Sequence, residues 1–205
     1  RHREQTGFDY GDVFTLDWNK AAGRILAGGR FSVRFFTADG PIGSRDLVRP
    51  DGTKLMFADW HPRENKIALA AQDATVHIWS NGFKTERNVD SFPGFIGCVK
   101  WSPDGEKLAV NDSSETVRIL NPEGDTIQEF SGNRGIPRTM AWSPDGKLLA
   151  VTRRGGMVDI FNADGDVHSQ NIHTGGATDA AFSPDGTQLA TSGLDANVRL
   201  TQIDS

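Results

Sequence analysis

Two markers recur along the chain with the same period, and this regularity constrains the fold more than any other feature of the sequence. The first marker is an aromatic residue, found at Trp18, Trp60, Trp101, Trp142 and Phe182. Its positions lie 42, 41, 41 and 40 residues apart. The second marker is the valine of a Val-x-(Ile/Leu/Phe) run, found at Val33, Val76, Val117, Val158 and Val198. Two markers that share a period of about 40 residues indicate a repeat protein.

The third copy illustrates the pattern within one period. The stretches 96–101, 107–110, 116–120 and 126–130 have the composition and alternation of short strands, and Ser102-Pro103-Asp104-Gly105 after the first stretch is a turn sequence. No segment of the chain keeps the 3.6-residue period of a helix, so helices should be nearly absent. Four short antiparallel strands in about 40–45 residues are typical of a β-propeller blade.

We therefore predict an all-β fold, a β-propeller of five four-stranded antiparallel blades. The chain is expected to form one domain, 1–205, with repeats at about 9–49, 50–91, 92–132, 133–172 and 173–205 plus 1–8. A single twisted sheet cannot bury both of its faces, whereas stacking around an axis gives each face a neighbour. The aromatic markers are expected to fill the space between blades. A ligand-binding stripe of aromatic residues is the alternative.

The last copy carries the most complete motif. Residues 173–186 read His-Thr-Gly-Gly-Ala-Thr-Asp-Ala-Ala-Phe-Ser-Pro-Asp-Gly, and two further strand-like stretches follow at 189–193 and 195–200. This arrangement resembles the WD-repeat (WD40) family, and the resemblance covers nearly the whole chain. It implies a propeller of WD-type blades, usually seven in number, and a function in holding other proteins rather than in catalysis.

The resemblance also implies a buried hydrogen-bonded network in each blade, formed by a His, a turn Asp, a Ser or Thr and a Trp. In the last copy His173, Asp195 and Ser192 match these positions, but Thr201 stands where the Trp would be. The other four copies lack the His. The network is therefore expected to be incomplete in every copy, and stability should depend more on apolar contacts.

Five copies in a family that usually has seven need an explanation. The segment 2–6 lies where the fourth strand of the last repeat would fall if the chain closed on itself, and this pairing would hide two strand edges. We predict closure of the ring in this way, which would make the protein a monomer. The alternative is that residues 1–8 are a linker and that the chain is a fragment of a larger, seven-bladed propeller or part of an oligomer.

Charge and composition exclude several partner classes. The formal net charge is −5, which argues against nucleic-acid binding because phosphates need a basic surface. No apolar run reaches the roughly 18–20 residues of a membrane span, and residues 1–6 lack the apolar region of a signal peptide. The single cysteine, Cys98, allows no intrachain disulfide and reads as a small core residue. We expect a cytoplasmic protein.

No catalytic or metal constellation is evident. Most acidic residues stand in turns such as Ser-Pro-Asp-Gly, where an Asp side chain caps the turn backbone. The five histidines lack the spacing of a zinc site. We therefore expect no enzymatic activity, no cofactor and no metal.

Several residues that local structure does not require stand in the loops before the first strands and between the second and third strands. They are Arg30, Phe31, Phe95, Glu115, Arg134, Arg153 and Arg154. Arg and aromatic residues are enriched at protein-binding hot spots. We predict that this loop face binds a peptide or protein, and that the three arginines of the fourth copy form a basic spot for an acidic or phosphorylated peptide. A solvated charge group is the alternative for that spot. A small-ligand or glycan-binding module and a hydrolytic propeller remain as other function classes.

Overall fold

The computed structural model contains strands, turns and loops. It describes residues 13–19, 23–29, 32–41, 47–48, 54–80, 85–89, 92–130, 135–162, 165 and 167–203. No helix occurs in these ranges. The prediction of an all-β fold is therefore confirmed for the part of the chain that the structure describes.

The strands form five consecutive antiparallel sheets. Sheet 1 contains β1 (Val13–Asn19), β2 (Arg24–Gly29), β3 (Ser32–Thr37), β4 (Gly40–Pro41) and β5 (Leu47–Val48). Sheet 2 contains β6 (Leu55–Trp60), β7 (Ile67–Ala71), β8 (Val76–Ser80) and β9 (Thr85–Val89). Sheet 3 contains β10 (Ile96–Trp101), β11 (Leu108–Asp112), β12 (Val117–Leu120) and β13 (Thr126–Phe130). Sheet 4 contains β14 (Pro137–Trp142), β15 (Leu149–Arg153), β16 (Met157–Phe161) and β17 (Val167–Asn171). Sheet 5 contains β18 (Ala177–Phe182), β19 (Gln188–Gly193) and β20 (Val198–Gln202).

Strand order within each sheet follows the chain. Sheets 2, 3 and 4 have four strands in sequence order, as the repeat pattern predicts. In sheet 1 the fourth position is divided, because β4 and β5 pair with opposite ends of β3. Sheet 5 has three strands in the described ranges. The segment 2–6, predicted to supply its fourth strand and to close a ring, lies outside the described residues.

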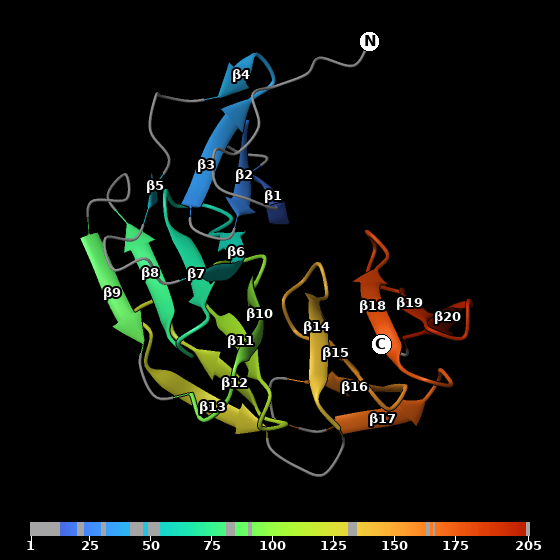
Figure 1. The fold of residues 1–205 in the computed structure, drawn as a ribbon. Coiled ribbons are helices and arrows are strands. Elements are labelled where there is room, and N and C mark those ends of the chain that lie inside the picture. The colour runs from blue at the N-terminus through green and yellow to red at the C-terminus, as the bar shows by residue number, and fades with distance from the viewer. Residues whose placement is uncertain are drawn as a thin grey trace.

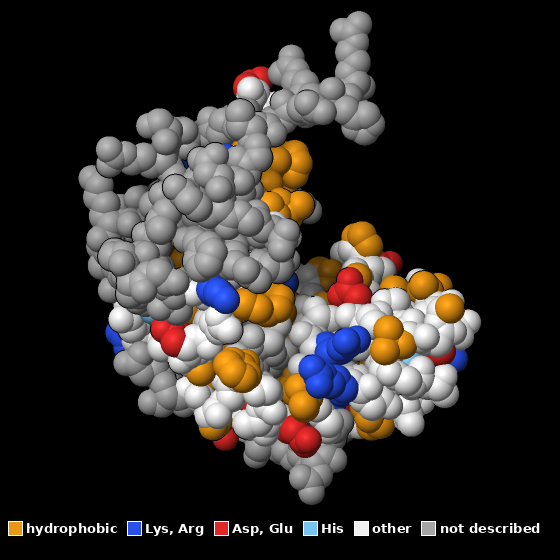
Figure 2. Space-filling model, viewed as in Figure 1, with side chains coloured by type: hydrophobic (Ala, Val, Ile, Leu, Met, Phe, Trp, Pro, Cys, Tyr) orange, Lys and Arg blue, Asp and Glu red, His pale blue; other side chains and the backbone are white. Residues whose placement is uncertain are grey.

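The five sheets stand side by side around an open arc (Figure 1). Their first strands are neighbours, with β1 beside β6, β6 beside β10, β10 beside β14, and β14 beside β18. The last strands β9, β13 and β17 lie at the outer edge of the arc. Figure 1 shows the arc open between sheet 1 and sheet 5, and the space-filling view is also open there (Figure 2).

The three Ser-Pro-Asp-Gly sequences form the same turn after a first strand. In sheet 3, the Ser102 hydroxyl donates to Asp104 over 2.5 Å and accepts the backbone N–H of Lys107 over 3.0 Å. Gly105 has a φ of +79°, which glycine adopts without a steric cost. Equivalent bonds join Ser143 to Asp145, and Ser183 to Asp185. The turn carboxylates are therefore explained by local structure, as the sequence predicts.

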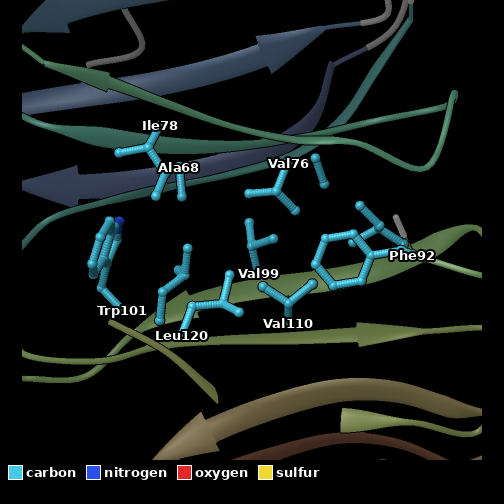
Figure 3. Packing of buried hydrophobic residues seen from close by; sticks show 11 residues of the cluster. Ala68, Val76, Ile78, Phe92, Val99, Trp101, Val110 and Leu120 are labelled. Carbon is cyan, nitrogen blue, oxygen red and sulfur yellow. The ribbon is translucent and has the colours of Figure 1, made fainter. Parts of the chain in front are cut away.

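Apolar side chains fill the space between consecutive sheets. We call the side of a sheet turned toward the next sheet along the chain its forward face, and the opposite side its backward face. Within β7, Ala68 and Ala70 face sheet 3, whereas Ile67 and Leu69 face sheet 1. Figure 3 shows the cluster between sheets 2 and 3, where Val76 and other side chains of sheet 2 point toward those of sheet 3. Four such clusters separate the five sheets.

The aromatic markers fill these spaces at four of the five positions. Trp60 and Trp101 are buried in the clusters on the backward faces of sheets 2 and 3. Trp142 and Phe182 are partly buried in the corresponding clusters of sheets 4 and 5. Trp18 differs, because its side chain is largely exposed. The expectation of a buried marker is wrong there, since no described sheet covers the backward face of sheet 1.

Candidate functional site

Loops of sheets 3 to 5 contact one another in series, and together we call them the loop rim. It consists of the loops before the first strands and the turns between the second and third strands. In sheet 3, the N–H of Ser113 donates to the carbonyl of Phe95 over 2.9 Å, and the Phe95 N–H donates to the Ser113 hydroxyl over 3.0 Å. The Glu115 carboxylate then accepts the N–H of Gly135 over 3.4 Å. This last bond connects sheet 3 to the loop that precedes β14.

The loop rim continues across sheets 4 and 5. The Arg154 N–H donates to the carbonyl of Ile136 over 3.0 Å. The Arg154 carbonyl oxygen lies so close to Gly176 that a Cβ there would approach it to 2.6 Å, and Gly176 has a φ of +128°. This contact between the sheets therefore requires glycine. The Gly176 carbonyl accepts the N–H of Leu194 over 2.9 Å, which completes the connection to the turn between β19 and β20.

The exposed side chains of the loop rim combine apolar and basic character. Phe95 and Leu194 are exposed large apolar residues, and Arg154 between them is also exposed. Arg138, on β14, is a second exposed arginine of sheet 4. In Figure 2, Lys and Arg side chains gather over sheet 4, with hydrophobic side chains on both sides of them. The arrangement offers two apolar anchors with positive charge between them.

Apart from Arg153, the predicted contact residues fall into two groups. Arg30, Phe31 and Arg134 lie outside the described residues. Phe95, Glu115 and Arg154 lie together on the loop rim. Leu194 belongs to the same surface, although sequence reasoning missed it. Its position in the turn between the second and third strands of the last copy, the same position as Arg154 in the fourth, was the available signal.

Arg153 is a correction to the sequence analysis, because it lies inside the protein and not in an exposed turn. Its exposed fraction is 1%. Its Nε donates to Asp159 Oδ2 over 2.5 Å, and its Nη1 donates to the carbonyl of Gly135 over 2.7 Å. The same Nη1 reaches the carbonyl of Glu115 at 3.4 Å. Arg153 thus links the loops of sheets 3 and 4 from inside the protein, and its guanidinium group does not lie on the surface.

Sheet 3 contains the same ion pair with the charges exchanged. There Asp112 stands at the position of Arg153, and Arg118 stands at the position of Asp159, because both pairs link the second strand to the third. Arg118 Nη1 donates to Asp112 Oδ2 over 3.1 Å. Both pairs are separated by six residues in the sequence, and this spacing was the missed signal. A buried charge is tolerated only when it is paired, so the two partners in each sheet depend on each other.

The last sheet contains the His, Asp and hydroxyl groups of the network that the WD-repeat resemblance implies, but Thr201 replaces its Trp. His173 Nδ1 lies 2.9 Å from Asp195 Oδ1, as predicted. His173 Nε2 lies 3.0 Å from the hydroxyl of Thr191, so Thr191 and not Ser192 provides the third group. Ser192 instead pairs with Thr178 on the forward side of the strand. Hydrogen bonds from Arg199 and His173 hold the pKa of Asp195 well below its ordinary value.

A second candidate site lies where the first strands of sheets 1 to 4 end. It is a cavity of about 480 Å³, lined in part by Trp18, Trp60, Trp101 and Trp142. A row of charged residues on the forward faces crosses it, consisting of Asp17, Asp59 and Lys100. We call it the axial cavity.

The charged row of the axial cavity also links neighbouring sheets. Asp17 accepts the N–H of Trp60 over 2.6 Å, and Asp59 accepts the N–H of Trp101 over 2.7 Å. Asp59 also pairs with Lys100 Nζ at 2.5 Å. Burial raises the pKa of Asp59 to about 6; Lys100 opposes this shift and Asp17 adds to it. Burial alone would lower the pKa of Lys100, but the Asp59 carboxylate more than offsets this and leaves it above its ordinary value.

Other reactive groups do not form a site in the described ranges. Burial raises the pKa of the Cys98 thiol to about 11, so the thiol stays protonated at neutral pH. Among the residues that the structure describes, no group of three or more His, Cys, Asp and Glu side chains is arranged to hold a metal ion. None of the described elements is a helix that could cross a membrane.

Comparison with known proteins gives one family. A search of the curated proteins gave no match. Residues 51–202, about three quarters of the chain, match the family model of eukaryotic translation initiation factor eIF2A, whose fold is a WD40-like β-propeller. The matched range contains sheets 2 to 5, and with them the loop rim and most of the axial cavity. The chain belongs to the family described as eukaryotic translation initiation factor eIF2A.

Proposed function

We propose that the five sheets are blades of a WD40-like β-propeller and that this propeller is a non-catalytic protein-interaction module acting in translation initiation. The match of residues 51–202 to the eIF2A family carries this proposal. The packing of consecutive sheets around an arc, with their first strands innermost, supports the assignment of blades. Repeat arrays of this kind use the surface formed by equivalent loops for recognition.

The loop rim is the binding surface in this proposal. Phe95 and Leu194 supply apolar area, and Arg154 supplies a group that forms strong bonds to carboxylates and phosphates. The backbone contacts that connect these loops, together with the buried Arg153, hold the surface in one arrangement. A rigid surface loses little conformational entropy when it binds. We propose a protein or peptide with acidic and apolar residues as the partner.

Affinity capture with loop-rim variants tests the proposal. The double variant Phe95→Asp/Arg154→Glu should lose translation-related proteins that the parent captures from an extract, while its melting temperature stays within about 2 °C of the parent's, because surface changes have small effects on stability. Ile127→Asp is the matched control, since Ile127 is an exposed apolar residue on the outer strand β13. Equal capture by the parent and the double variant would refute a function of the loop rim.

A further inference from the structure

Tryptophans form a large part of the lining of the axial cavity. Four of the five tryptophans of the chain line it, each at the end of a different first strand. Trp18 is largely exposed and Trp142 is half-buried, so these two rings offer accessible surface. A volume of about 480 Å³ lies within the range of small-molecule sites in proteins. The cavity is therefore large enough and aromatic enough to hold a small organic group.

The charges of this cavity do not balance. Two carboxylates, Asp17 and Asp59, line it together with one ammonium group, that of Lys100. Lys100 pairs with Asp59 at 2.5 Å and also attracts Asp17, but one ammonium group cannot neutralise two carboxylates, so the lining keeps an excess negative charge. Asp17 is fixed in place, because its two oxygens accept the backbone N–H groups of Trp18 and Trp60. A cation entering the cavity would meet a preformed negative group beside aromatic rings.

Two of these rings already have a lysine ammonium group nearby. Lys66 Nζ lies 5.9 Å from the ring centroid of Trp101, and Lys107 Nζ lies 5.9 Å from that of Trp142. Neither lysine lines the axial cavity. The face of an indole carries partial negative charge, so it attracts weakly hydrated cations more strongly than neutral groups. The exposed ring of Trp18 and the half-buried ring of Trp142, which also line the cavity, can attract a cation in the same way.

A hard metal ion fits the cavity poorly. Magnesium and calcium require about six or more oxygen ligands. Of the carboxylate oxygens here, three accept backbone N–H groups and the fourth binds Lys100. Indole rings provide no oxygen at all. An organic cation needs no such ligand set, because ring contact and one nearby carboxylate satisfy it.

We infer that the axial cavity binds a weakly hydrated organic cation, of the quaternary ammonium or guanidinium class, between its tryptophan rings and next to Asp17. The cation can be a free molecule such as choline or the end of a partner's methylated lysine or arginine side chain. The site is separate from the loop rim and does not depend on the function proposed for that surface.

Tryptophan fluorescence of the purified chain tests the inference. Choline chloride should produce a saturable change, and 3,3-dimethylbutan-1-ol, its uncharged isostere, should bind at least about tenfold more weakly, because it lacks the charge that interacts with the rings and the carboxylate. Sodium chloride at the same concentration controls for ionic strength. The acetylated methylamides of trimethyllysine, lysine and arginine form a second series. Tighter binding of trimethyllysine or arginine than of choline would identify a partner's side chain as the source, and the reverse would identify a free molecule.

Two matched variants locate the site. Asp17→Asn should weaken choline binding at least about fivefold, because the amide removes the negative charge and leaves one of the two backbone N–H groups without its acceptor. Asp179→Asn is its control, since Asp179 also accepts the N–H of the next residue at the equivalent edge of sheet 5 but does not line the cavity. The inference is overturned if choline causes no saturable change, if the neutral isostere binds as tightly, or if both variants behave like the parent.

Discussion

Sheets 4 and 5 carry the same kinds of residues on their forward faces but meet different surroundings. In sheet 4, Val158 and Ile160 of the third strand pack against sheet 5, and Val158 has an exposed fraction of 1%. In sheet 5 the equivalent residues are Val198 and Leu200, with exposed fractions of 72% and 68%. The register of the strands is the same in both sheets. Position in the array, and not residue type, therefore decides which apolar side chains are buried.

The backward face of sheet 1 differs from those of sheets 2 to 4 in the same way. Trp18 has an exposed fraction of 56%, whereas Trp101 at the equivalent position of sheet 3 has one of 5%. The two outer faces of the array thus hold most of the large exposed apolar residues among those that the structure describes. Repeat arrays gain stability from the contact between neighbours, so the end sheets should be less stable than the middle ones.

A charge placed on each forward face gives the largest contrast. Val158→Asp should reduce the free energy of unfolding by about 4–5 kcal/mol or prevent folding, because it buries an unpaired carboxylate between sheets. Val198→Asp should change it by less than about 0.5 kcal/mol, since the side chain already faces solvent. Urea unfolding followed by circular dichroism measures both. A comparable loss in the two variants would show that the forward face of sheet 5 is covered in solution.

Removal of the aromatic marker sharpens the same comparison on the backward faces. Trp101→Ala should cost about 3–5 kcal/mol, because it removes a large side chain from the cluster between sheets 2 and 3. Trp18→Ala should cost less than about 1 kcal/mol. Thermal unfolding of the two variants gives the difference. If Trp18→Ala were as destabilising as Trp101→Ala, the interpretation of sheet 1 as an uncovered end would be wrong.

Removal of a buried polar group should also cost more free energy of unfolding in the middle of the array than at its end. Arg153→Ala leaves Asp159 buried without its cation and should cost about 3–5 kcal/mol. His173→Ala should cost about 1–3 kcal/mol, because Thr191 and Asp195 lose a partner but Asp195 keeps its bond to Arg199. Hydrogen exchange by mass spectrometry should show that Arg153→Ala lowers the protection of backbone amides in sheets 3 and 4. His173→Ala should lower it only in sheet 5. A uniform loss of protection across all sheets in either variant would contradict this.

The carboxyl group of Asp59, at the contact between sheets 2 and 3, should make the free energy of unfolding depend on pH. The raised pKa of Asp59, about 6, means that the folded state binds its proton more tightly than the unfolded state does. Its contribution to the free energy of unfolding therefore falls as pH rises from about 4 to 6. Asp59→Asn should lack this trend, so its stability relative to the parent should improve by roughly 1–2 kcal/mol between pH 4.5 and 7. A constant difference over that range would mean that Asp59 titrates normally.

Much of the fold could be predicted because its signals are local. Alternating apolar residues and turn sequences such as that of residues 102–105 specify strands and hairpins without reference to distant parts of the chain. The pairing of His173 with Asp195 could also be predicted, from a motif within one repeat. The spacing of Arg153 and Asp159 was a local signal for their ion pair, but the burial of Arg153 could not be predicted because it also depends on carbonyl groups of the loops before sheet 4 and in sheet 3.

The sequence by itself determined the period, the strands, the turns and the two faces of each sheet, since all of these follow from residue order within about 40 positions. Only the tertiary structure decided which faces are covered, which loops meet, and where tryptophans of successive repeats line a common cavity. Val158 and Val198 have the same local sequence pattern, yet one is buried and the other exposed. The physical reason is that burial is a property of a pair of surfaces, and the sequence of one repeat specifies only its own side of that pair.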